Sequence, residues 1–148
     1  PVNEKIIPTG EIKNVEGTPF DFRKKKKIGR DLSQIDNQLS LGNGYDHCWV
    51  LNNYNKELRK IGEAQSTESM INMEVFTDLP GVQLYIGNFL DGSLRSKKGM
   101  KYVKRSGFCL ETQFFPNSPN TQGFPSTVLE PGNKFNSTTT FKFSLLKN

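Results

Sequence analysis

Short turn-forming clusters punctuate this chain along almost its whole length, and they limit the elements between them to short ones. The clearest clusters are Pro8-Thr-Gly10, Gly42-Asn-Gly44, Pro80-Gly81, Asp91-Gly92 and Pro131-Gly132. Proline fixes φ near the value that turns need, and Gly and Asn tolerate positive φ, so such clusters mark chain reversals. The segments between them are rich in Val, Ile, Phe, Tyr and Thr, which favour strands. The pattern predicts an all-β fold.

Six segments have strand character, and we predict strands at 47–51, 57–64, 70–77, 82–87, 107–114 and 138–146. The last is the clearest, because Thr139, Phe141, Phe143 and Leu145 alternate with Thr138, Thr140, Lys142 and Ser144. Such alternation indicates a half-buried antiparallel strand. A turn of helix is expected within 20–30 and another within 31–38. Either a sandwich or a barrel accommodates strands of this length.

Length and composition suit one ordinary globular domain. The chain has 148 residues, a net charge of +5 and 34% hydrophobic residues, which is not the signature of disorder. No apolar run approaches the roughly 20 residues of a membrane span, and no signal peptide is recognisable among the first residues. Cys48 and Cys109 therefore have no secretory context. We expect both thiols to be reduced core residues of a cytoplasmic protein.

A run of basic residues, 23–27, is the most conspicuous charged feature. No interleaved aromatic residues, zinc-ligand spacing or helix-turn-helix pattern accompanies it, so we interpret it as a solvated loop rather than a nucleic-acid surface. The only histidine, His47, must face away from its neighbour Asp46 if both lie on a strand, which favours a structural role. Trp49 shares the side of His47, which favours core packing over sugar stacking. A lone histidine with two distant cysteines predicts no zinc site.

One carboxylate stands in an otherwise apolar segment, FCLETQ (108–113). Read as a strand, the segment places Phe108, Leu110 and Thr112 on one face, and Glu111 on the other with Cys109 and Gln113. A carboxylate on a partly dry surface is costly unless it is paired, hydrogen-bonded or chemically useful. Glu111 is therefore either an ion-paired surface residue or a candidate for proton transfer.

Six segments in order resemble the aldose 1-epimerase (galactose mutarotase) family, and together they cover about residues 7–143. They are IPTGEI (7–12), EGTPFDFR (16–23), GYDH (44–47), PGVQLYIGNFLDG (80–92), SGFCLETQ (106–113) and FPSTVLEPG (124–132). The resemblance implies a large antiparallel β-sandwich with a shallow sugar groove on one sheet. The family domain is about twice as long, so residues 1–148 are expected to be its C-terminal half, with the N-terminal half absent.

The resemblance also implies an isomerase of carbohydrate metabolism that interconverts the α and β anomers of free hexoses such as galactose and glucose. This chemistry uses one general base and one general acid, and no metal or other cofactor. Glu111 occupies the position of the family's catalytic base. The family's acid is a histidine of the N-terminal half, which has no counterpart here. The expected partners are the free hexose and that N-terminal half, with no nucleic acid or membrane, and the complete domain is expected to be a monomer.

Two further residues match substrate-binding positions of the family. Asp46, in GYDH, is suited to accept hydrogen bonds from two neighbouring hydroxyls, although it could instead stabilise the turn before it. Gln83 carries an amide that both donates and accepts, which suits a hydroxyl-rich ligand, although it could instead make a cross-strand hydrogen bond. As a strand, Val82 and Leu84 face one way and Gln83 the other.

Three alternative functions follow from the same residues. A sugar-binding relative without catalysis would keep the groove and have no need of Glu111. An epimerase of hexose phosphates would require a basic pocket for the phosphate group. A basic interaction protein would use the lysines of 24–27 and bind polyanions in a salt-dependent way.

Overall fold

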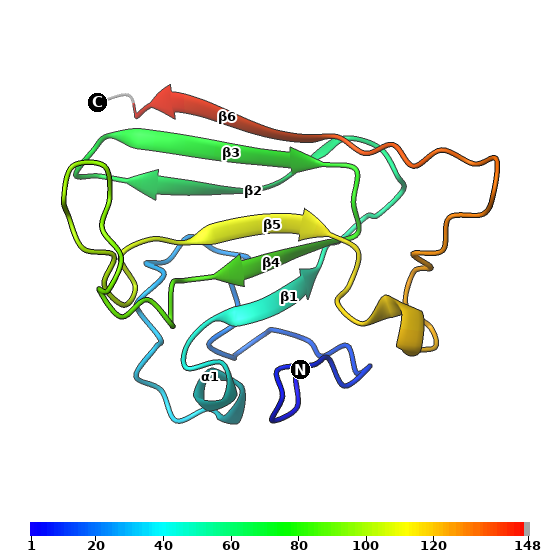
Figure 1. Ribbon diagram of the computed structural model, residues 1–148, viewed down its shortest axis with the longest axis horizontal. Helices are drawn as coiled ribbons and strands as arrows, with labels where there is room; N and C mark the ends of the chain where they lie inside the picture. The colour runs from blue at the N-terminus through cyan, green and yellow to red at the C-terminus, as the bar shows by residue number, and fades with distance from the viewer. Residues whose placement is uncertain (147–148) are drawn as a thin grey trace.

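The computed structural model describes residues 1–146, so the last two residues of the expected 1–148 domain lie outside it. The elements in chain order are α1 (Asn37–Leu41), β1 (Asp46–Val50), β2 (Arg59–Ser66), β3 (Ile71–Thr77), β4 (Gly81–Tyr85), β5 (Cys109–Gln113), the 3-10 helix η1 (Ser118–Asn120) and β6 (Thr139–Leu145). They form two three-stranded antiparallel sheets, ordered β1-β4-β5 and β2-β3-β6 (Figure 1). No helix within residues 1–146 is long and apolar enough to cross a membrane.

All six predicted strands are present, and their ends differ from the prediction by a residue or two. The helical turn expected within 20–30 is wrong. Phe20 and Phe22 both pack on the ring of Tyr45, and side chains two positions apart share a side only in extended backbone. Among residues 1–146 the only α-helix is α1, which begins at Asn37, so just its first two residues fall within the 31–38 where a turn of helix was expected. Asp36 caps it by accepting hydrogen bonds from the backbone of the first turn.

The register of the first sheet decides which side chains lie together. Gln83 on β4 faces Glu111 on β5, and Leu84 faces Leu110. His47 on β1 faces Leu84 on the same ladder. Directly opposed residues of antiparallel strands project to the same side. The sheet therefore has one polar face with Gln83 and Glu111, and one apolar face with Leu84, Leu110 and His47.

The core lies against this apolar face. Its buried residues are Leu39, Tyr45, Leu84 and Ile86, and partly buried aromatic residues of the N-terminal segment pack onto them. The Trp49 indole donates a hydrogen bond to the carbonyl of Phe20 at 2.9 Å. Trp49 is therefore a core residue, as the sequence predicts, and its polar atom is satisfied inside the core.

The second sheet is buried at its central strand and exposed along β6. The buried residues Val75 and Thr77 lie on β3, its central strand. Phe141, Phe143 and Leu145 of β6 project to the same side as Val75, yet Phe143 is 65% exposed and Leu145 is 73% exposed. The predicted alternation is correct, but the prediction that this strand is half-buried is wrong, because every residue of β6 is exposed.

His47 is buried beneath the first sheet. Its Nδ1 accepts a hydrogen bond from the backbone N–H of Asp46 at 3.1 Å, and its ring packs edge-on against Phe20. Accepting at Nδ1 requires the neutral ring. Burial accordingly lowers the pKa of His47 to about 4.

The free energy of unfolding of the chain should therefore decrease as the pH is lowered, starting above the pH range in which carboxylates take up protons. Because the pKa of His47 is about 4 in the folded state and near 6.5 in the unfolded state, the unfolded state binds more protons between these values. The free energy of unfolding should decrease by roughly 3 kcal/mol from pH 6.5 to pH 4. Urea unfolding at several pH values measures the slope. In His47→Asn, whose Oδ1 can replace Nδ1 as the acceptor, the slope above pH 4.5 should vanish, and its persistence would contradict this assignment.

Candidate active site

A carboxylate and an amide meet on the polar face of the first sheet. Asp46 is the first residue of β1, directly after the turn that connects this strand to α1. Gln83 lies on the neighbouring strand β4, and its Nε2 donates to Oδ1 of Asp46 at 2.8 Å. Both side chains are half-buried. A charged hydrogen bond in partly dry surroundings is strong, so it fixes the two side chains relative to each other.

This hydrogen bond also fixes the orientation of the Gln83 amide. A carboxylate can only accept, so the NH₂ group of Gln83 must face Asp46 and the carbonyl Oε1 must point away. Oε1 of Gln83 is buried and has no hydrogen-bond partner within residues 1–146. A buried acceptor without a partner is costly unless a ligand or water supplies the donor. Oε1 of Gln83 is therefore an acceptor beside the carboxylate whose donor is not supplied by residues 1–146.

Glu111 lies on the next strand, directly opposite Gln83. Its side chain is exposed, and no ion pair or side-chain hydrogen bond to it occurs among the described residues. Asp46, Gln83 and Glu111 thus form a diagonal row across three adjacent strands. The structure thus brings the three residues that match the family's site positions onto one face of the sheet, and their roles stay predictions.

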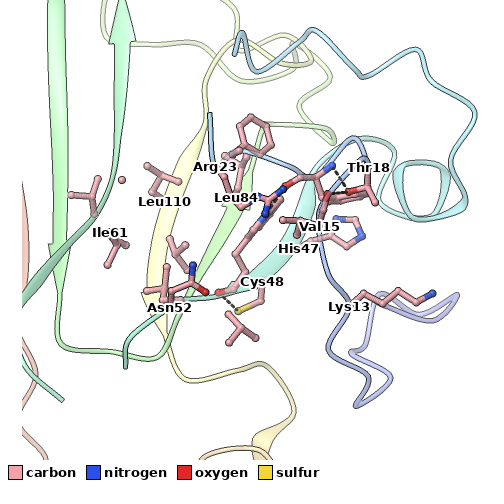
Figure 2. A pocket seen from close by; sticks show the side chains of 18 of the residues that line it. Lys13, Val15, Thr18, Arg23, His47, Cys48, Asn52, Ile61, Leu84 and Leu110 are labelled. Atoms are coloured by element: carbon pink, nitrogen blue, oxygen red, sulfur yellow. Dashed lines mark hydrogen bonds between the residues drawn. The ribbon is translucent and has the colours of Figure 1, made fainter. Parts of the chain in front are cut away.

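A large cavity lies elsewhere in the described part of the chain. Its lining includes His47, Leu84, Leu110 and Ile61, so it lies on the apolar side of the first sheet, toward the second sheet (Figure 2). Asp46, Gln83 and Glu111 do not line it. The cavity is an open groove that reaches the surface, since exposed residues such as Lys13 and Asn52 also line it, while the candidate site lies on the other face of the sheet.

Within residues 1–146 the structure brings together no group of three His, Cys, Asp or Glu side chains that could hold a metal ion. Both cysteines are free thiols. Cys48 is half-buried, and burial raises the pKa of its thiol to about 11. Cys109 is exposed, so the prediction that both thiols are core residues is wrong for Cys109. Cys48 and Cys109 lie on the same face of the sheet, but Cys109 begins β5, an edge strand of the sheet β1-β4-β5, and this position leaves it exposed.

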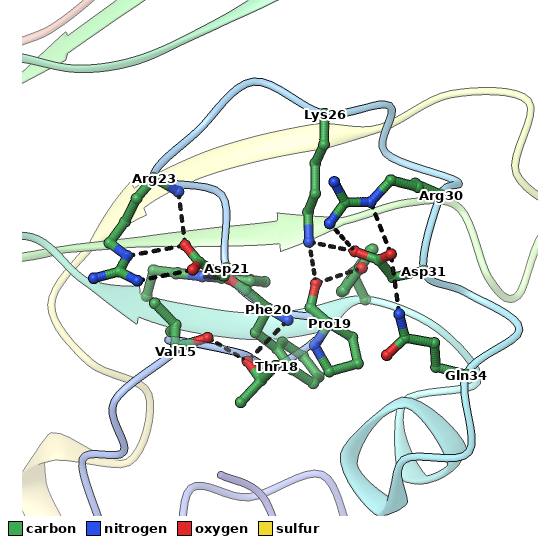
Figure 3. A network of polar contacts seen from close by, with 12 residues as sticks. Val15, Thr18, Pro19, Phe20, Asp21, Arg23, Lys26, Arg30, Asp31 and Gln34 are labelled. Atoms are coloured by element: carbon green, nitrogen blue, oxygen red, sulfur yellow. Dashed lines mark hydrogen bonds and ion pairs between the residues drawn. The ribbon is translucent and has the colours of Figure 1, made fainter.

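A buried ion pair supports the turn in front of Asp46 (Figure 3). The Lys26 side chain is only 2% exposed, and its Nζ contacts Oδ2 of Asp31 at 2.7 Å. The same ammonium donates to the carbonyl of Pro19, which also accepts from the hydroxyl of Tyr45 at 2.8 Å. Tyr45 is fully buried and immediately precedes Asp46. The ion pair and the start of β1 therefore share one backbone carbonyl.

The basic run is thus only partly a solvated loop. The prediction is wrong for Lys26, which also lies 4.1 Å from the centre of the Phe22 ring. Lys25 pairs with Glu63 of β2. Hydrogen bonds from Arg30, which has the larger effect, and from Lys26 hold the pKa of the Asp31 carboxyl well below its ordinary range. These contacts attach the basic run to the rest of the fold. The sequence did not indicate them, because Glu63 is distant along the chain and Asp31 comes after the run.

Comparison with known proteins shows the family to which the chain belongs. Residues 1–142 match the family model described as aldose 1-epimerase, and the chain belongs to the aldose 1-epimerase family. It is 46% identical to the galactose mutarotase of Bos taurus over 145 residues, covering 98% of this chain and 41% of that protein. It is 34% identical to the aldose 1-epimerase of Escherichia coli strain K12, covering 97% of this chain and 41% of that protein.

Solved structures give the same result. A GalM/aldose epimerase homologue from C. elegans superimposes with a TM-score of 0.77 at 25% identity, covering 99% of this chain and 43% of that one. Galactose 1-epimerase from Lactobacillus acidophilus NCFM gives a TM-score of 0.72 at 29% identity, covering 99% and 41%. The predicted family and all-β sandwich class are confirmed. The chain spans about two fifths of the length of these relatives.

Replacing the buried lysine should destabilise the chain far more than replacing its exposed neighbour. In Lys26→Met, the hydrogen bonds to Asp31 and to the Pro19 carbonyl are lost, and a buried carboxylate keeps only Arg30 and Gln34. We expect Tm, followed by circular dichroism, to fall by several degrees. Lys24→Met is the matched control, because Lys24 is exposed and makes no ion pair within the described residues. Equal Tm values for the two variants would show that the buried pair contributes nothing.

Proposed function

We propose that this chain supplies the catalytic base and the sugar-holding residues of a galactose mutarotase, an isomerase that interconverts the α and β anomers of free hexoses. The observation that carries the proposal is the row of Asp46, Gln83 and Glu111 on one open face. Two of its members are fixed to each other, and the third is a carboxylate without a partner among the described residues. The 46% identity with a galactose mutarotase supports the same reaction.

Anomer exchange needs two proton transfers on opposite sides of one sugar ring. A base removes the proton from the hydroxyl at C1 while an acid protonates the ring oxygen, and the C1–O5 bond opens to give an aldehyde. C1 then rotates, and the reverse transfers close the ring on either face. Glu111 is the base, since its carboxylate is exposed at the site and is not engaged by another side chain.

Asp46 and Gln83 hold the sugar rather than transfer protons. The carboxylate of Asp46 accepts from hydroxyl groups, and Oε1 of Gln83 accepts from another. The existing hydrogen bond between them means that neither side chain has to be ordered when the sugar arrives. Such preorganisation reduces the entropy cost of binding.

The acid comes from outside this chain. His47 cannot supply it, because it is buried on the opposite side of the sheet and its Nδ1 already accepts from the backbone. We propose that residues 1–148 are the C-terminal half of one domain whose N-terminal half carries the acid histidine. The exposed apolar side chains of β6 and the open groove support this proposal. The completed domain is expected to act as a cytoplasmic monomer on galactose and glucose, without a cofactor.

The role of Glu111 is tested in a reconstituted domain, in which this chain is joined to the preceding part of the Bos taurus galactose mutarotase that it does not match. Polarimetry follows fresh α-D-galactose and α-D-glucose against the buffer rate. Glu111→Gln should lower kcat by about 10²- to 10⁴-fold, because the base is lost, while the dissociation constant of the sugar changes little.

Glu130→Gln is the matched control, since Glu130 is an exposed loop residue without an ion pair among the described residues. It should leave both constants unchanged. Retained turnover in Glu111→Gln would exclude the proposed base. A reconstituted domain that binds sugar but never exceeds the buffer rate would instead indicate a sugar-binding relative.

A further inference from the structure

A buried amide outside the sugar-binding row holds the turn that carries Asp46. The turn runs from Gly42 to Tyr45 and connects α1 to β1. Asn88, in the loop after β4, is 3% exposed. Its Nδ2 donates to the carbonyls of Gly42 and Tyr45, each at 2.9 Å. One amide group therefore joins both ends of the turn, and Asp46 is the next residue along the chain.

The turn packs directly against Asn88. Gly44 has a φ of +129°, and a Cβ at this position would lie 2.4 Å from Oδ1 of Asn88. A side chain is therefore excluded at Gly44 both by backbone conformation and by the amide that packs against it. Oδ1 of Asn88 has no hydrogen-bond partner within residues 1–146. The amide is oriented wholly by its two donor bonds into the turn.

The outer side of the turn is held by the same loop. Nζ of Lys104 donates to Oδ1 of Asn43 at 2.8 Å, and the Arg105 guanidinium donates to the carbonyl of Asn43 at 3.2 Å. The backbone of Arg105 in turn donates to the carbonyl of Gly87, beside Asn88, at 3.0 Å. The turn is thus clamped between Asn88 on the buried side and Lys104 and Arg105 on the exposed side.

The position of this clamp has a consequence for the site. Gln83 meets the Asp46 carboxylate at 2.8 Å, a distance that a small shift of β1 along its axis would break. We propose that Asn88 is a positioning residue for sugar binding, which sets the Asp46 carboxylate against Gln83 by fixing the Gly42–Tyr45 turn. This inference rests on the proposed function, in which Asp46 holds substrate hydroxyls.

The experiment measures KM and kcat in the reconstituted domain for Asn88→Ala and for the isosteric Asn88→Asp. The first leaves two buried carbonyls unpaired, and the second turns a carboxylate toward them. Displacing a substrate-holding group weakens ground-state and transition-state binding alike. We expect KM to rise on the order of 10-fold with kcat per folded molecule nearly unchanged. A purely structural role would lower the folded fraction, and therefore the apparent kcat, without raising KM.

Two further variants keep the result interpretable. Lys104→Met removes the outer contact without entering the buried turn, and should raise KM by about 2- to 5-fold. Asn72→Ala is the control, since Asn72 also has a buried, unpaired amide oxygen but lies in the second sheet. It should leave KM unchanged. Unchanged KM in every folded variant at Asn88 and Lys104 would overturn the proposal.

A second measurement separates this inference from the proposed function. The side-chain NH₂ signals of Gln83, assigned by ¹⁵N NMR, report its hydrogen bond to Asp46 without any sugar or activity. They should shift in Asn88→Ala and stay unchanged in Asn72→Ala. If the reconstituted domain without substitutions is inactive but Asn88→Ala shifts the Gln83 signals, the proposed mutarotase function is refuted and the positioning role of Asn88 is retained. If that domain is active but Asn88→Ala leaves the Gln83 signals unshifted, the positioning role is refuted and the proposed function is retained.

Discussion

In the sheet formed by β1, β4 and β5, residues opposed across each ladder must project to the same side, and the site depends on this constraint. The register brings Gln83 opposite Glu111, and the hydrogen bond from Gln83 reaches diagonally to Asp46. A slip of one residue between β4 and β5 would send Glu111 into the apolar interior, where an unpaired carboxylate is too costly to remain ionised. The hydrophobic contacts of Leu84 and Leu110 on the other face therefore maintain the polar row.

The second constraint is electrostatic and acts at a distance from the row. Lys26 is almost wholly buried, and it is tolerated there because a carboxylate, a carbonyl and an aromatic face surround its ammonium. The carbonyl of Pro19 connects this cluster to the hydroxyl of Tyr45, the residue before β1. Asn88 donates to the backbone carbonyl of the same tyrosine. The start of β1 is thus held by polar contacts in an otherwise apolar core. Such contacts are directional, so they specify position more narrowly than hydrophobic packing does.

Local pattern was enough to predict the strands and their faces. Period-two alternation placed His47 and Trp49 away from Asp46, and Gln83 away from Leu84, because side-chain direction in a strand depends only on neighbours. The burial of β6 could not be predicted, since alternation shows which side chains share a face and not whether anything covers it. Lys26 and Asn88 were missed for a related reason. Asn88 donates to backbone carbonyls of another segment, Lys26 donates to the carbonyl of Pro19 as well as to Asp31, and a carbonyl carries no sequence signal. The roles of Asp46, Gln83 and Glu111 rest on the family motif, which the geometry accommodates without testing.

The exposed strand β6 has a consequence for the behaviour of this chain in solution. It lies at the edge of its sheet, so one row of its backbone N–H and C=O groups has no neighbouring strand among the described residues. Three large apolar side chains project from one side of it, and Lys142 is the only charge within the strand. An edge of this kind is a template on which a second copy can add its own β6, and a single lysine is a weak barrier to such pairing. The colloidal stability of the chain, and the highest concentration at which it can be handled, should therefore be limited by this strand, which lies outside the sheet that carries Asp46, Gln83 and Glu111.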